Sequence, residues 1–144
     1  KLKNKIQTLQ DGDIISLGDS KIKVISTPGH TSGGVSYLLD KHLIAGDTLF
    51  IYGAGICAFS DANPAILFDS LNKLKKQVSD GVYLLCGHNY GVELTTTMAK
   101  QKQYNPFLLI DNKDDFIKYR TKIHDTTRKY PMAPMNIDEL KQLL

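Results

Sequence analysis

Short apolar stretches separated by turn residues fill the first half of the chain, and they predict β-strands. In residues 21–26 apolar side chains alternate with lysines, so one face of this strand is expected to lie in solvent. Residues 82–86 are apolar without interruption, which predicts a strand buried on both faces. The other predicted strands are residues 14–15, 35–39 and 43–45, with turns at residues 18–19 and 40–41.

The second half of the chain changes to the spacing of amphipathic helices. Asn63 followed by Pro64 is a typical helix start. After it, leucines recur at helical spacing up to Val78, so this helix is expected to lay one apolar stripe on a core. Further helices are predicted at residues 92–103, 113–129 and 137–144. Strands followed by helices indicate an α/β fold in which helices pack against one sheet.

Composition and charge narrow the class of protein. The chain has 144 residues, of which 42% are hydrophobic and 23% charged, as in one ordinary soluble domain. Its net charge of +3 comes from scattered basic residues, which argues against a nucleic-acid partner. No apolar run approaches the roughly 20 residues needed to cross a membrane, and the start does not resemble a secretory signal. Cys57 and Cys86 lack redox or metal-site spacing, so we expect reduced thiols in a cytoplasmic protein.

Three polar residues far apart in the sequence share an unusual setting. His30, Asp47 and His88 each follow a predicted strand, and each has a glycine directly before it. If the three strands end at one edge of the sheet, the three side chains meet there. Two imidazoles and a carboxylate are suited to zinc, with iron or manganese as alternatives. A metal ion of this kind lowers the pKa of a bound water, so no serine or cysteine nucleophile is required.

Other candidate residues are given structural roles. Isolated histidines are usually surface or hydrogen-bonding residues, and this is the interpretation of His42 and His124. Ser70 and Lys73 match the S-x-x-K pattern of serine acyl enzymes, but they fall in the predicted amphipathic helix without the accompanying motifs. Cys86 precedes His88 by two positions, which makes its contact with a metal worth testing.

Three motifs, taken together, resemble a known family. T-P-G-H-T-S-G-G at residues 27–34, A-G-D-T-L-F at 45–50 and C-G-H-N-Y-G at 86–91 are similar, in this order, to the C-terminal half of the metallo-β-lactamase superfamily. The similarity is greatest to glyoxalase II-like thioester hydrolases. N-P-F-L-L-I-D-N at residues 105–112, followed by Phe116 and Arg120, also resembles the tail of that group.

The resemblance implies half of an αβ/βα sandwich with two zinc ions at its active site. In this alignment His30 binds the first metal, Asp47 bridges both and orients the attacking hydroxide, and His88 binds the second. The H-x-H-x-D-H motif that supplies the remaining ligands is absent from the 144 residues. We therefore expect residues 1–144 to be the C-terminal part of one metallohydrolase domain. Residues 1–10 would join the missing N-terminal half, residues 113–144 would form C-terminal helices, and this part alone would be inactive.

The resemblance also bears on the substrate. At residues 55–59, where glyoxalase II carries a basic residue for glutathione, this chain has no Lys or Arg. The chain is therefore more similar to the hydrolases of polyketide biosynthesis. The expected substrate contacts are Ile56 and Cys57 in this stretch, and Tyr90 after His88. These hydrolases act on acyl thioesters of an acyl carrier protein; coenzyme A or glutathione thioesters are the alternative.

Two further interpretations stay open. A non-catalytic half-fold would expose an apolar sheet face and serve as an assembly module, for instance as a homodimer. The same ligands could also serve phosphodiester hydrolysis or oxygen chemistry at iron.

Overall fold

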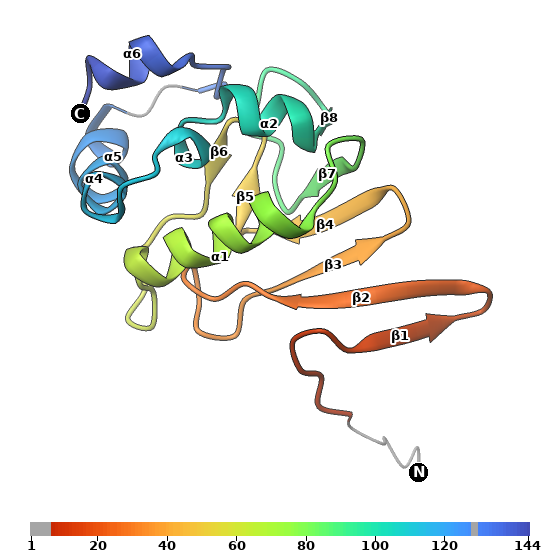
Figure 1. The fold of residues 1–144 in the computed structure, drawn as a ribbon. Helices are drawn as coiled ribbons and strands as arrows, with labels where there is room; N and C mark the ends of the chain where they lie inside the picture. The colour runs from red at the N-terminus through yellow and green to blue at the C-terminus, as the bar shows by residue number, and fades with distance from the viewer. Residues whose placement is uncertain (1–6, 128–129) are drawn as a thin grey trace.

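The chain forms a six-stranded sheet with helices packed against it (Figure 1). The computed structural model describes residues 7–127 and 130–144. The large sheet has the order β1-β2-β3-β4-β7-β8, and β5 pairs with β6 in a second sheet. The strands are β1 (Ile14–Leu17), β2 (Ser20–Ser26), β3 (Val35–Leu39), β4 (His42–Gly46), β5 (Leu49–Phe50), β6 (Gly53–Ala54), β7 (Tyr83–Cys86) and β8 (Thr96–Thr97). The predicted α/β class is confirmed, as are the five predicted strands.

The direction of the strands decides where their carboxyl ends lie. Strands β1 to β4 pair antiparallel in chain order, and β4 pairs with β7 in parallel. Since β2 and β4 are both antiparallel to β3, the strands β2, β4 and β7 run in the same direction. Their carboxyl ends therefore lie at one edge of the sheet, as the sequence argument required.

Helix α1 (Pro64–Gln77) connects the antiparallel strands to β7 and covers the sheet. The side chain of Asn63 accepts hydrogen bonds from the backbone N–H groups of Ala65 and Ile66, which caps the first turn as predicted. The predicted apolar stripe is buried: Leu67, Leu71, Leu74 and Val78 are each at most 1% exposed. Burial of this stripe against the sheet forms the centre of the core.

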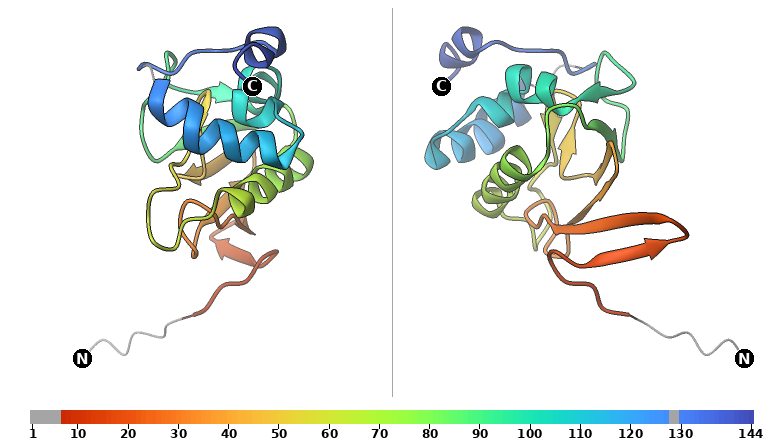
Figure 2. Two further views of the ribbon diagram at one scale, coloured as in Figure 1. Left: turned by 90° about the vertical axis from the view of Figure 1, so that its left-hand side faces the viewer. Right: turned by 45° about the vertical axis from the view of Figure 1, so that its right-hand side comes forward.

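The remaining helices lie on the same side of the sheet as α1 (Figure 2). They are α2 (Met98–Tyr104), α3 (Pro106–Leu109), α4 (Lys113–Lys118), a π-helix (Tyr119–His124), α5 (Asp125–Thr127) and α6 (Ile137–Lys141). Asn105 caps α3 and is itself buried, with its amide donating to the carbonyls of Phe50 and Gly53. This amide holds the turn between β5 and β6 against the helices.

The structure corrects two of the predicted helices. The helix expected at residues 92–103 begins only at Met98, because Thr96 and Thr97 pair with β7 and the Thr97 side chain then caps the helix. The helix expected at residues 113–129 widens into the π-helix at Tyr119, and its last two residues lie outside the described part of the chain. The final helix, expected to reach residue 144, ends at Lys141.

The prediction that residues 82–86 are buried on both faces is wrong. Leu84 is 1% exposed, but Tyr83 and Leu85 are 44% and 41% exposed. In the neighbouring strand β4, Leu43 is buried while Ile44 is 42% exposed. The continuous apolar run thus places some side chains in the helix-covered core and others on the opposite face of the sheet. That face is apolar, and the described residues leave it exposed.

Within residues 7–127 and 130–144, none of the helices is long and apolar enough to cross a membrane.

Candidate metal centre

The structure brings His30, Asp47 and His88 together at the carboxyl edge of the sheet. Each follows one of the three strands that run in the same direction, β2, β4 and β7. Nε2 of His30 lies 3.7 Å from Oδ2 of Asp47, and Nε2 of His88 lies 3.5 Å from the same oxygen. The carboxylate therefore occupies the position between the two imidazoles.

These distances fit side chains that bind a common metal ion better than side chains that form hydrogen bonds with each other. At 3.5 and 3.7 Å the atom pairs are too far apart for good hydrogen bonds. Two ligand atoms on one tetrahedral zinc ion, each about 2.1 Å from it, lie about 3.4 Å apart. Among the described residues, no group of three or more His, Cys, Asp or Glu side chains forms a ready metal cluster. The side chains thus fit a partial ligand set with Asp47 at its centre.

The ring of His30 is oriented by a hydrogen bond. Its Nδ1 lies 2.7 Å from the carbonyl oxygen of Ile56, and only a protonated Nδ1 can donate to a carbonyl. In the neutral ring Nε2 then carries a lone pair, and this is the nitrogen that faces Asp47. A backbone carbonyl behind a metal-binding histidine commonly fixes its tautomer in this way.

Buried hydroxyl groups connect the loops that carry His30 and Asp47. The hydroxyl of Thr27 lies 3.0 Å from that of Ser36 and 3.1 Å from that of Thr48. Thr27, Ser36 and Thr48 are all at most 3% exposed. Because the hydroxyls satisfy one another away from water, they hold the strand ends in fixed positions relative to each other.

Gly87 has no side chain, so the end of β7 can lie directly against the Asp47 carboxylate. A Cβ atom at Gly87 would lie 2.2 Å from Oδ1 of Asp47, which no real contact allows. The backbone N–H of Gly87 also donates to the carbonyl of Gly46, directly before Asp47. Glycine at this position therefore lets the carboxylate sit against the end of β7, beside His88.

A cavity of about 200 Å³ opens over the three residues. Its walls are mainly aromatic and apolar, and they consist of His30, Asp47, Phe50, Ala54, Ile56, Phe59, His88, Tyr90, His124, Tyr130 and Met132. The ring of Tyr90 stacks on that of His88 at 5.0 Å between centroids. Tyr90 therefore both fixes the His88 ring and faces the cavity, and Ile56 also lines it. Cys57 is not among the lining residues, although it was predicted as a substrate contact.

Both cysteines are free thiols with little thiolate character. The Cys57 thiol points to the carbonyl of Gly29, at 3.6 Å. Burial raises the pKa of Cys57 to about 11 and, likewise, the pKa of Cys86 to about 11. Cys86 does not line the cavity over the three residues.

The raised pKa of Cys57 predicts slow alkylation. In a Cys86→Ser background at pH 7.5, we expect iodoacetamide to modify Cys57 about tenfold more slowly than N-acetylcysteine, because the thiolate is scarcer and its higher intrinsic nucleophilicity offsets this only in part. The rate should rise about tenfold per pH unit, since the pKa lies well above the assay range. Mass spectrometry of timed samples measures both rates. Equal rates for protein and free thiol would show that Cys57 is an ordinary exposed thiol.

Two contributors to the site were not singled out as such from the sequence. Arg120 is fully buried and donates to the carbonyls of Ala54 and Gly55, beside the loop whose Ile56 carbonyl orients His30. Its guanidinium also donates to Nδ1 of His124, 3.0 Å away. His124, which had been assigned a structural role, thereby becomes part of the cavity wall. In the sequence, Arg120 stood out only as part of the resemblance to the family's tail, and its spacing of four residues from His124 places both on one helical face.

The S-x-x-K residues have structural roles, as expected. The hydroxyl of Ser70 donates to the carbonyl of Pro28 at 2.6 Å. The ammonium of Lys73 donates to the carbonyl of Ser26 and pairs with Asp11. Both side chains thus fasten α1 to the end of β2.

With the geometry in place, comparison with known proteins identifies the class. Residues 3–88 match the model of the metallo-beta-lactamase superfamily. The chain belongs to this superfamily, and its sheet with flanking helices is part of that fold, as the motifs predicted.

Two curated relatives are similar to this chain over part of their length. The chain is 36% identical over 115 residues to a probable polyketide biosynthesis zinc-dependent hydrolase of Bacillus subtilis, an alignment that covers 80% of this chain and 51% of the relative. It is 46% identical over 86 residues to a hydroxyacylglutathione hydrolase of Brucella ovis, covering 58% of this chain and 32% of the relative. The chain thus spans about half the length, or less, of these curated relatives.

Solved structures show the same similarity. ETHE1 from Myxococcus xanthus superposes with a TM-score of 0.74 at 27% identity, over 94% of this chain and 56% of that protein. TTHA1623, solved in a di-iron-bound form, superposes with a TM-score of 0.60 at 27% identity, over 73% of this chain and 50% of that protein. Relatives and neighbours therefore include proteins described with zinc and with iron.

Proposed function

We propose that His30, Asp47 and His88 supply half of the ligands of a two-zinc site that hydrolyses acyl thioesters. The observation that carries the proposal is the position of the Asp47 carboxylate, within 3.7 Å of Nε2 of both histidines. Three donor side chains are too few for two four-coordinate ions. The remaining ligands would come from a separate segment with the H-x-H-x-D-H motif.

The uncovered face of the sheet supports a second segment. Ile44, Tyr83 and Leu85 lie together on the paired strands β4 and β7, and each is more than 40% exposed. Packing of the missing half against this apolar face would bury it and bring further ligands to the same edge. The alternative, an assembly module without catalysis, rests on this same face but leaves the orientation of His30 unexplained.

Zinc ions held at this edge would supply Lewis acidity and a water of lowered pKa. The chain's own residues would position the reactants. Asp47 would orient the attacking water, and the His30 ring is held in place by the Ile56 carbonyl. The apolar cavity wall would exclude other water from the thioester. Water oxygen bonds to the carbonyl carbon, the carbon–sulfur bond breaks, and the products are a carboxylic acid and a thiol.

The residues that line the cavity over Asp47 favour a thioester whose thiol part is uncharged where it enters this cavity. Among the described residues, neither Lys nor Arg lines the cavity over Asp47. A glutathione carboxylate would find no cationic partner there, whereas the pantetheine part of a carrier-protein thioester is uncharged and needs none. The name of the Bacillus subtilis relative, a polyketide biosynthesis hydrolase, agrees with this choice.

Thiol release tests the proposal. The chain is combined with a separately expressed segment bearing the H-x-H-x-D-H motif, and the assembly is loaded with zinc. We expect faster thiol release from an acyl pantetheine thioester than from S-acylglutathione, and almost none from the chain alone. Rapid zinc-dependent release by the chain alone would contradict the incomplete ligand set. An assembly holding two zinc ions per chain that releases neither thiol would overturn the assignment.

A further inference from the structure

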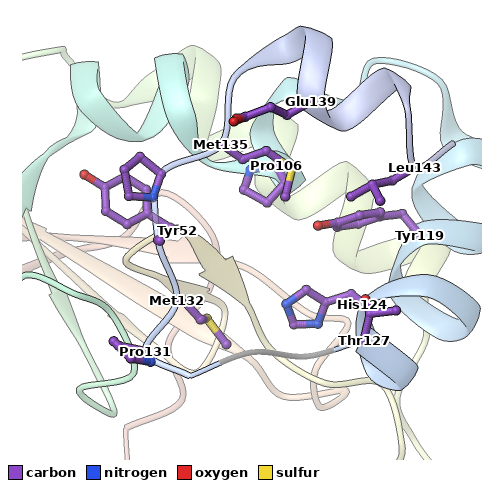
Figure 3. A pocket seen from close by; sticks show the side chains of 12 residues that line it. Tyr52, Pro106, Tyr119, His124, Thr127, Pro131, Met132, Met135, Glu139 and Leu143 are labelled. Carbon is purple, nitrogen blue, oxygen red and sulfur yellow. The ribbon is translucent and has the colours of Figure 1, made fainter.

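A second, larger cavity adjoins the one over the candidate metal centre (Figure 3). Its volume is about 510 Å³, within the range of small-molecule sites. His124 and Met132 line both cavities, and Figure 3 shows them at the same end of the larger one. The larger cavity therefore begins where the smaller one ends, and it extends away from Asp47 between the C-terminal helices and the segment before α6.

The walls of the larger cavity are mainly apolar. They are formed by Tyr52, Pro106, Tyr119, His124, Thr127, Pro131, Met132, Ala133, Pro134, Met135, Glu139 and Leu143. Neither Lys nor Arg is found among these described lining residues. Glu139 is exposed and accepts from the Asn136 backbone in a capping box, so its charge lies in water at the rim. An anionic ligand is disfavoured by this composition, and an uncharged apolar one is favoured.

Backbone hydrogen bonds hold the wall between residues 131 and 135 in place. Met132 donates to the carbonyl of Tyr90 at 2.6 Å and accepts from the N–H of Val92. Met135 donates to the carbonyl of Tyr104. Because both methionines are fixed through their backbones, this wall exists before a ligand arrives, while their flexible thioethers can adapt to its shape.

Tyr119 contributes a polar hydroxyl to the wall of the larger cavity. Tyr119 is 3% exposed, and its ring packs on those of Phe107 and His124. Burial raises the pKa of Tyr119 to about 12, so the hydroxyl keeps its proton and remains a donor at neutral pH.

We infer that this larger cavity holds the apolar acyl chain of the thioester substrate, with the reacting carbonyl at the His124 and Met132 end. The choice of a thioester as the ligand rests on the proposed function. Binding of the acyl chain in the cavity can still be measured without any hydrolysis. A long acyl chain is then selected over a short one, because each additional methylene buried strengthens binding about threefold to fourfold.

Methionine methyl groups give a direct readout in the metal-free chain. The chain has three methionines, of which Met132 and Met135 line the cavity and Met98 is buried elsewhere. Methyl-labelled protein is titrated with S-octanoyl-N-acetylcysteamine and, separately, with the S-acetyl compound. We expect saturable shifts of the Met132 and Met135 signals with an unmoved Met98 signal, and roughly a thousandfold weaker binding of the acetyl compound, which lacks six methylenes.

Matched variants locate the ligand. Ala133→Trp should fill the cavity from its rim and weaken octanoyl binding at least tenfold, whereas Ala99→Trp, at an exposed position on α2, should leave it unchanged. Equal affinities for the two thioesters, or shifts that do not include Met132 and Met135, would overturn the inference. If the binding is seen but the zinc-loaded assembly releases no thiol, the proposed hydrolysis fails while the acyl site stands.

Discussion

Replacing Arg120 with alanine is expected to lower the free energy of unfolding by about 3–4 kcal/mol. The guanidinium is fully buried, donates to the carbonyls of Ala54 and Gly55, pairs with Asp125 and lies 4.9 Å over the ring of Phe107. Its removal takes a buried donor from the carbonyls of Ala54 and Gly55, breaks the ion pair with Asp125 and leaves a cavity in the core. Urea denaturation followed by circular dichroism measures the change.

Lys122→Ala is the matched control for this experiment. Lys122 lies on the same π-helix but is exposed, so its loss should change stability by no more than about 0.5 kcal/mol. If the Arg120 and Lys122 variants were equally stable, the buried guanidinium would not be holding the helices to the loop after β6.

Gly29→Ala is expected to cost about 2–4 kcal/mol, by two effects that add. Gly29 has a φ of +131°, a backbone conformation that residues with a side chain rarely adopt. A Cβ atom there would also lie 2.4 Å from the backbone nitrogen and Cα of Leu67. The loop that carries His30 must therefore move away from α1, or the helix must shift.

The neighbouring Gly33→Ala variant separates these effects from a general sensitivity of the loop. A Cβ atom at Gly33 would meet nothing within 4 Å, so the stability should be nearly that of the natural chain. Thermal unfolding of the two variants in parallel provides the comparison. Similar losses in both would mean that the contact between Gly29 and Leu67 is not the cause.

The strands and the first long helix could be predicted because their signals are local. The strand at residues 21–26 and the Asn63 cap were predicted from adjacent residues, and both are confirmed. The wet face expected for this strand is not continuous, because Ile25, on the same face as Lys21 and Lys23, is buried. The exposure of Tyr83 and Leu85 could not be predicted in this way, since it depends on a covering layer that is not found among residues 7–127 and 130–144. The late start of α2 followed from the pairing of β8 with β7, a contact between residues distant in sequence.

The candidate site could likewise be predicted from the sequence only in part. His30, Asp47 and His88 could be grouped from the sequence because strand ends that share a direction meet at one edge. Whether they act as ligands remains a prediction. The roles of Arg120 and His124 could not be foreseen, because they depend on the π-helix that places both against the loop after β6.

The zinc affinity of the chain shows whether Asp47 is a metal ligand. Competition with a chromophoric chelator gives the dissociation constant for the natural chain, for Asp47→Ala and for Asp19→Ala, a control in the exposed turn between β1 and β2. We expect the Asp47 variant to bind zinc at least about a hundredfold more weakly, because loss of a residue that only hydrogen-bonds a metal ligand already commonly costs 10–100-fold. The Asp19 variant should bind as the natural chain does. Equal affinities of all three proteins would show that zinc is held elsewhere, and would contradict a metal centre at this edge of the sheet.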